Sequence, residues 1–169
     1  SRAVQNTIVA LGALLSWLML GQLLFVERID RLPALGGWRL LFYLLTVLAP
    51  TLTFVPVARW IRAPFYEVEA VAGWATVGLV LGLVTPADPP TLAQFLLFLL
   101  PLTVALATLC TLGSYLVGLR VYRNDLRRYD TVRARRQGYL VAMILVAGML
   151  LISVGTLSPT SAALLVLVG

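Results

Sequence analysis

The sequence predicts an all-α fold, a polytopic bundle of transmembrane helices. Hydrophobic residues make up 60% of the chain and charged residues only 12%, and the mean hydropathy is +0.95. A water-soluble domain of this length could not bury that much apolar surface, whereas a lipid bilayer removes the need to bury it. The apolar residues also gather in runs of about 20, the length that crosses a hydrocarbon core about 30 Å thick.

Five runs approach or exceed that length and predict a single transmembrane domain over residues 1–169. The predicted spans cover residues 4–26, 40–57, 68–84, 92–119 and 139–157. A sixth apolar stretch, over 162–168, is too short to cross the membrane. It is either the start of a sixth span that continues beyond this sequence or a tail that packs on the bundle. The turn residues at 158–161 favour the first alternative.

The first predicted span, over 4–26, has a tryptophan near its centre. Tryptophan is enriched at membrane–water interfaces, so the central position of Trp17 is unusual. We expect the Trp17 ring to fill the core of the helix bundle or to face lipid, rather than to contact a cofactor or pigment.

The second span, over 40–57, contains Pro50 and Pro56. Each proline leaves one helical carbonyl without its usual donor, because proline has no backbone N–H. The nearby hydroxyls of Thr51 and Thr53 are able to satisfy carbonyls of this kind. We therefore expect a bent helix whose concave side packs against protein.

The third span, over 68–84, is the shortest and carries Gly78 and Gly82, four residues apart. Glycines at this spacing share one helix face and allow another backbone to approach closely. We expect these two glycines to form a helix-packing face, within this chain or between subunits. We also expect this short span to be surrounded by other helices.

The fourth span, over 92–119, is about 42 Å long at 1.5 Å per residue and exceeds the hydrocarbon core. Asp88 is its expected N-terminal cap. The helical pattern continues beyond the span, so we expect the helix to project from the membrane. The chain then turns near residues 129–136 and returns as the span over 139–157.

The distribution of arginine predicts which side of the membrane each loop faces. All thirteen cationic residues are arginine, and seven of them lie between 120 and 136. Arginine is costly in hydrocarbon and favours the cytoplasmic side, so the predicted loop over 120–138 is expected to be cytoplasmic. Alternation of the spans then gives ten arginines inside and three outside, with a cytoplasmic N-terminus in a bacterial inner membrane. The arginines expected to meet anionic lipid headgroups are Arg120, Arg123, Arg127, Arg128, Arg133, Arg135 and Arg136.

Residue types that usually carry chemistry are missing from this sequence. Histidine is absent, Cys110 is the single cysteine, and no Asp, Glu or Arg falls inside the hydrocarbon part of a predicted span. Histidine is the commonest general base and metal ligand, and buried charges mark ion and proton pathways. We therefore expect no enzymatic activity, no catalytic or cofactor-binding residue, no metal site and no nucleic-acid partner.

These exclusions leave three classes of function. The favoured class is a non-catalytic membrane subunit that scaffolds or seals a larger complex, with membrane lipids and other membrane protein subunits as partners. The second is the N-terminal membrane sensor or anchor region of a larger signalling protein. Residues 129–137 resemble the short Arg-rich linker in multi-span regions of bacterial sensor kinases, although this short match assigns no family. The third, a small transporter or channel component, is disfavoured by the lack of buried charge.

Overall fold

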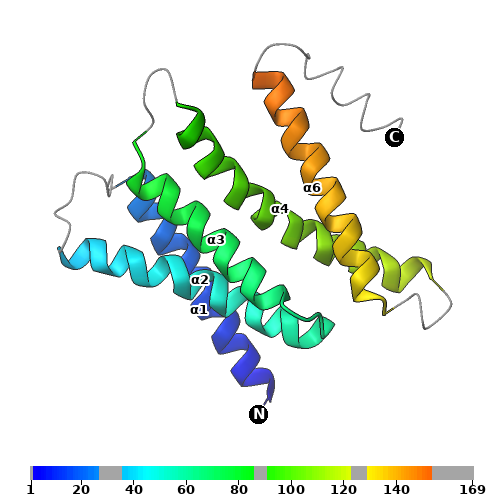
Figure 1. Ribbon diagram of the computed structural model, residues 1–169. Coiled ribbons are helices and arrows are strands. Elements are labelled where there is room, and N and C mark those ends of the chain that lie inside the picture. Colours follow the sequence, from blue (N-terminus) through cyan, green and yellow to red (C-terminus); the bar gives the residue numbers. More distant parts are fainter. Residues whose placement is uncertain (1, 27–35, 86–90, 123–128, 154–169) are drawn as a thin grey trace.

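The computed structural model describes residues 2–26, 36–85, 91–122 and 129–153 (Figure 1). These residues form five α-helices and no strand, which confirms the predicted all-α class. The helices are α1 (Arg2–Phe25), α2 (Gly37–Ile61), α3 (Tyr66–Leu83), α4 (Leu92–Val121) and α6 (Thr131–Ser153). The sixth apolar stretch, over 162–168, lies outside the described residues.

The helices follow the predicted spans closely except at the start of α6. The helix α4 continues past residue 119 to Val121, in line with the expected extension of that helix. The chain is helical again from Thr131, however, so the predicted loop over 120–138 is too long. Asp130 explains the early start, since its Oδ1 accepts a hydrogen bond from the backbone N–H of Arg133 at 2.9 Å. A carboxylate in this position caps the helix, and its negative charge interacts favourably with the positive end of the helix dipole. Most of the predicted turn near 129–136 is therefore the first part of a helix.

The start of α4 is capped by Thr91, whereas the expected cap, Asp88, lies outside the described residues. Thr91 Oγ1 accepts the backbone N–H of Gln94, and Gln94 Oε1 accepts the backbone N–H of Thr91, both at 3.3 Å. This capping box satisfies two donors that have no partner within the helix.

The helix α2 is continuous through both of its prolines. The predicted use of the neighbouring hydroxyls is wrong, because they do not bond the carbonyls that the prolines leave without a donor. Thr51 Oγ1 donates to the Val47 carbonyl at 2.7 Å, and Thr53 Oγ1 donates to the Ala49 carbonyl at 2.9 Å. A threonine in a helix reaches the carbonyl four residues before itself, and that local geometry decides the pairing.

A short turn, over residues 62–65, joins α2 to α3. Arg62 and Phe65 both adopt the left-handed conformation, with φ of 53° and 63°. Arg62 occupies the position after the helix where glycine is usual, and its N–H donates to the Ala58 carbonyl at 2.9 Å. The left-handed residues let the chain reverse quickly, so that α2 and α3 lie side by side.

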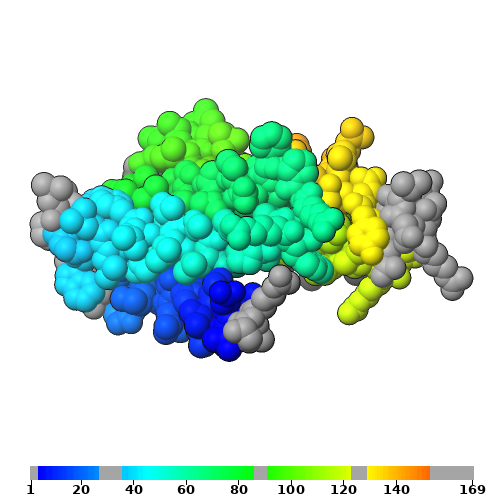
Figure 2. Space-filling view, turned by 90° about the horizontal axis from the view of Figure 1, so that it is seen from below, coloured from blue at the N-terminus to red at the C-terminus, as the bar shows by residue number. Residues whose placement is uncertain are grey.

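Each helix packs against the next one along the described chain, and successive helices alternate in direction (Figure 1). The helix α3 lies between α2 and α4 and is the most enclosed of the described helices. In its most apolar stretch of 18 residues, 44% of the residues are buried, against 17% in the corresponding stretch of α6. The shortest span is therefore surrounded by other helices, as predicted. Figure 2 views the bundle from below and shows the α2–α3 turn beside the start of α6.

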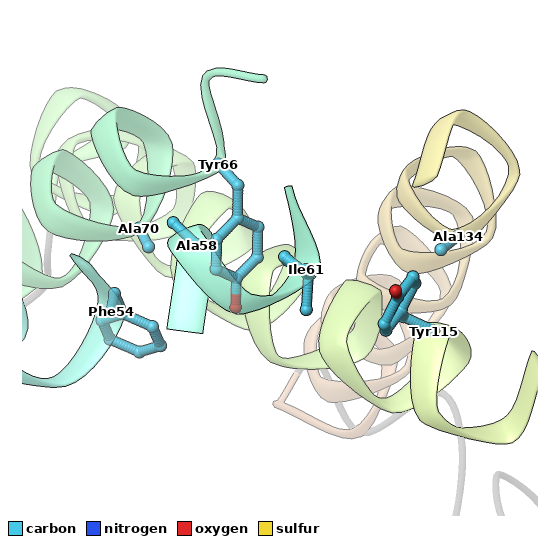
Figure 3. Close-up of a cluster of buried hydrophobic side chains, with 7 residues drawn as sticks. All are labelled: Phe54, Ala58, Ile61, Tyr66, Ala70, Tyr115 and Ala134. Atoms are coloured by element: carbon cyan, nitrogen blue, oxygen red, sulfur yellow. The ribbon is translucent and has the colours of Figure 1, made fainter. Parts of the chain in front are cut away.

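The main core cluster joins four helices around the α2–α3 turn (Figure 3). Its buried residues are Phe54, Ala58 and Ile61 of α2, Tyr66 and Ala70 of α3, Tyr115 of α4 and Ala134 of α6. The Tyr66 hydroxyl donates to the Thr108 carbonyl at 3.1 Å, which gives the buried phenol the partner it needs. A second cluster, of Leu20, Leu23, Phe42 and Leu45, holds α1 to α2.

Candidate functional site

The two glycines of the predicted packing face lie against neighbouring helices of the same chain. A methyl group on Gly78 would lie 3.0 Å from Thr46 Cγ2, closer than an ordinary van der Waals contact. A methyl group on Gly82 would lie 3.1 Å from Leu24 Cδ2 and would overlap the buried ring of Phe42. The structure thus brings Gly78 and Gly82 into contacts with α1 and α2 that leave no room for a larger side chain.

Two further glycines lie against α4. A methyl group on Gly73 of α3 would lie 3.1 Å from the Ala105 backbone nitrogen. A methyl group on Gly138 of α6 would overlap the backbone of Thr111. The pairs α3–α4 and α4–α6 are therefore each in contact at a glycine that leaves no room for a side chain.

Gly138 belongs to a run of small residues on one face of α6. Ala134 and Ala142, four residues before and after it, are completely buried. Small residues at this spacing let two membrane helices approach closely. The spacing of these small residues is visible in the sequence. The predicted loop over 120–138, however, places Ala134 and Gly138 outside any helix, so the sequence alone does not indicate a shared helix face.

Only part of the arginine cluster that was predicted to meet lipid headgroups lies within the described residues. The described members are Arg120, Arg133, Arg135 and Arg136, whereas Arg123, Arg127 and Arg128 lie outside. Arg120 and Arg136 are exposed at the surface. The other two described arginines have partners inside the protein.

Arg135 forms an ion pair with Glu69, and the guanidinium of Arg133 lies over the ring of Tyr122, 4.2 Å from its centroid. The ion pair joins the start of α6 to the start of α3, across 66 sequence positions. The Arg135 side chain is 44% exposed, so solvent screening limits the pair to about 0–1 kcal/mol of stability. Its main effect is to position these two helix ends.

Trp17 packs at the junction of α1, α2 and α3. Its Nε1–H donates to Thr53 Oγ1 at 2.9 Å, and its ring meets Trp74 edge to face with centroids 5.7 Å apart. Phe54 stacks against Trp74 at 6.2 Å. Trp17 therefore fills the protein interior, one of the two roles expected from the sequence.

Grooves open on the outer surface between neighbouring helices. One of about 1,040 Å³ lies between α1 and α2. Another, of about 490 Å³, lies between α4 and α6 and is lined by Cys110, Gly113, Ser114, Gln137, Leu140 and Val141. In this second groove the Ser114 hydroxyl donates to Gln137 Oε1 at 2.5 Å. No atom outside its own helix backbone lies within 4 Å of the point where a side chain on Gly113 would begin.

Comparisons with family models, with curated proteins and with solved structures find no significant match to this chain. Within the described residues, no group of three or more His, Cys, Asp or Glu side chains is placed to hold a metal ion. Five described helices are long and apolar enough to cross a membrane. The chain is therefore an integral membrane protein of the multi-pass class.

We predict that Gly78→Leu and Gly82→Leu each lower the thermal stability of the purified chain, because leucine would collide with Thr46 or Phe42. Overpacking of this kind costs about 1–3 kcal/mol. Thermal unfolding in detergent, followed by tryptophan fluorescence, measures the change.

The matched control is Gly21→Leu on α1, where no atom of another helix lies within 4 Å of the point at which the side chain would begin. This variant should unfold at the wild-type temperature or slightly above it, because leucine favours a helix more than glycine does. If all three leucine variants were as stable as the wild type, the packing role of Gly78 and Gly82 would be wrong.

Proposed function

We propose that this chain is a non-catalytic membrane subunit that scaffolds or seals a larger membrane assembly through helix–helix and lipid contacts. The observation that carries the proposal is the α4–α6 groove with Gly113 in its wall. Glycine weakens a helix by about 0.5–1 kcal/mol relative to alanine, and no neighbour in the described chain occupies the space above Gly113. A helix of another subunit could approach the α4 backbone closely at this point.

The side chains around this groove support the same proposal. Ser114 and Gln137 place a hydroxyl and an amide at the surface of two membrane helices. Polar groups of this kind hydrogen-bond across helix interfaces in membranes. Beyond the groove, α6 is the least buried of the described spans, which leaves most of its apolar surface for lipid or for a neighbouring subunit.

We further propose that the protein lies in a bacterial inner membrane with its N-terminus in the cytoplasm. The positions of the arginines support this orientation. Arg59 and Arg62 lie at the end of α2, and Arg120 lies at the end of α4. Three more arginines, at 133, 135 and 136, lie in the first two turns of α6. In an alternating bundle these helix ends share one side, and cations favour the cytoplasmic side. The exposed Arg120 and Arg136 would there meet anionic lipid headgroups.

Cysteine labelling tests this topology in a Cys110→Ser background. We predict that a membrane-impermeant thiol reagent applied to intact cells modifies Thr85→Cys, which follows α3 on the external side. It should leave Val132→Cys unmodified until the cells are permeabilised. Labelling of Val132→Cys in intact cells would reverse the proposed orientation.

Co-purification tests the subunit proposal. We predict that the tagged chain, extracted from its native membranes in mild detergent, retains at least one other membrane protein in a fixed ratio. Gly113→Leu should reduce the recovery of that partner without lowering the thermal stability of the chain, because nothing in the described chain lies within 4 Å of the point where the side chain would begin.

The control for this experiment is Gly148→Leu, which adds the same side chain to another open position, outside the groove. Equal partner recovery with both variants, or a chain that purifies alone, would contradict the proposal. A native polypeptide that fuses these helices to a soluble output domain would support the signalling alternative instead.

A further inference from the structure

The larger groove lies between the first half of α1 and the second half of α2. The two helices touch deeper in the bundle, where Leu52 packs near Gly12 and Thr53 accepts the hydrogen bond from Trp17. Towards the start of α1 and the end of α2, the groove opens to the surface with a volume of about 1,040 Å³. That volume lies at the upper end of the range for small-molecule sites.

The lining changes character along the groove. Gln5, Asn6 and Arg59 lie near the helix ends, whereas Ala13 and Leu52 lie deeper. At 1.5 Å per residue, the polar end and the apolar end are about 10–12 Å apart along the helix axes. A ligand that matches this lining has a polar, charged head and an apolar chain.

The mouth of the groove carries a cation and an aromatic ring. Arg59 is exposed and forms no ion pair within the described part of the chain. Trp60 also lines the groove, and its ring rests edge to face on Tyr115 of α4 with centroids 5.9 Å apart. A guanidinium suits the oxygens of a phosphate, and a tryptophan in this place suits the depth of lipid headgroups.

We propose that the α1–α2 groove is a binding site for one anionic glycerophospholipid. The lipid phosphate is held by Arg59 and by the side-chain amides of Gln5 and Asn6, and one acyl chain lies along the apolar floor formed with Ala13 and Leu52. None of the described arginines of 120–136 lines this groove, and the site does not depend on a partner subunit. The charge of Arg59, which has no ion-pair partner among the described residues, selects an anionic headgroup over a zwitterionic one.

Native mass spectrometry of the full chain in detergent tests the site. The added probes are phosphatidylglycerol and phosphatidylcholine with the same acyl chains, at equal concentration. We expect the wild type to retain one phosphatidylglycerol in preference to phosphatidylcholine. Arg59→Gln should lower phosphatidylglycerol binding about fivefold, the effect of removing one cation at a membrane surface. Arg62→Gln, which removes the same charge from a nearby exposed position that does not line the groove, should leave the preference intact.

A second pair of variants tests the apolar floor independently of charge. Ala10→Trp fills the groove from an exposed position on α1, and Leu14→Trp adds an indole to an exposed α1 position outside it. Only Ala10→Trp should abolish lipid retention. Equal binding of the two lipids by the wild type, equal losses with the two arginine variants, or full retention by Ala10→Trp would each overturn the proposal.

Discussion

Close approach of helix backbones at small residues is the constraint on which the rest of this structure depends. Lipid is as apolar as a leucine side chain, so membrane helices associate through van der Waals packing rather than through the hydrophobic effect. Each pair of neighbouring described helices has a glycine where the two helices meet. The contacts are Gly12 with Leu52, Gly78 with Thr46, Gly73 with Ala105 and Gly138 with Thr111. Among these four glycines, the fit is tightest at Gly73 and Gly138, where backbone atoms of α4 lie within 3.1 Å of the point at which a side chain would begin.

Most hydroxyl groups within the described spans donate their hydrogen bonds to backbone carbonyls of the same helix. The buried hydroxyls of Thr46, Thr108 and Thr111 each donate to a carbonyl of their own helix at 2.7 Å. Such bonds satisfy the hydroxyl in an apolar medium without specifying a neighbouring helix. Polar side chains that are open to the surroundings include those that line the two grooves and those at the arginine-rich helix ends. Those are the places where the proposed subunit and lipid contacts fall.

The spans were predictable because a crossing of hydrocarbon needs about 20 apolar residues, and that length signal survives without knowledge of the fold. The spacing of Gly78 and Gly82 also indicated a packing face. The start of α6 was missed because the Asp130 carboxylate, which accepts the backbone N–H of Arg133, caps a helix that begins in arginine-rich sequence. The same error concealed Gly138. The partner of Arg135 and the groove between α1 and α2 depend on how helices cross. The periodicity of one helix carries no information about that crossing.

One methyl group on α6 tests the central constraint most directly. The measurement is the Tm of the purified full chain carrying Gly138→Ala, compared with Gly113→Ala on the facing helix. Gly138 is enclosed by the Thr111 backbone, whereas Gly113 faces open space. The account predicts that Gly138→Ala lowers the Tm by several degrees. Gly113→Ala should leave it unchanged or raise it, because alanine favours a helix more than glycine does. The same Tm for both variants would contradict the account.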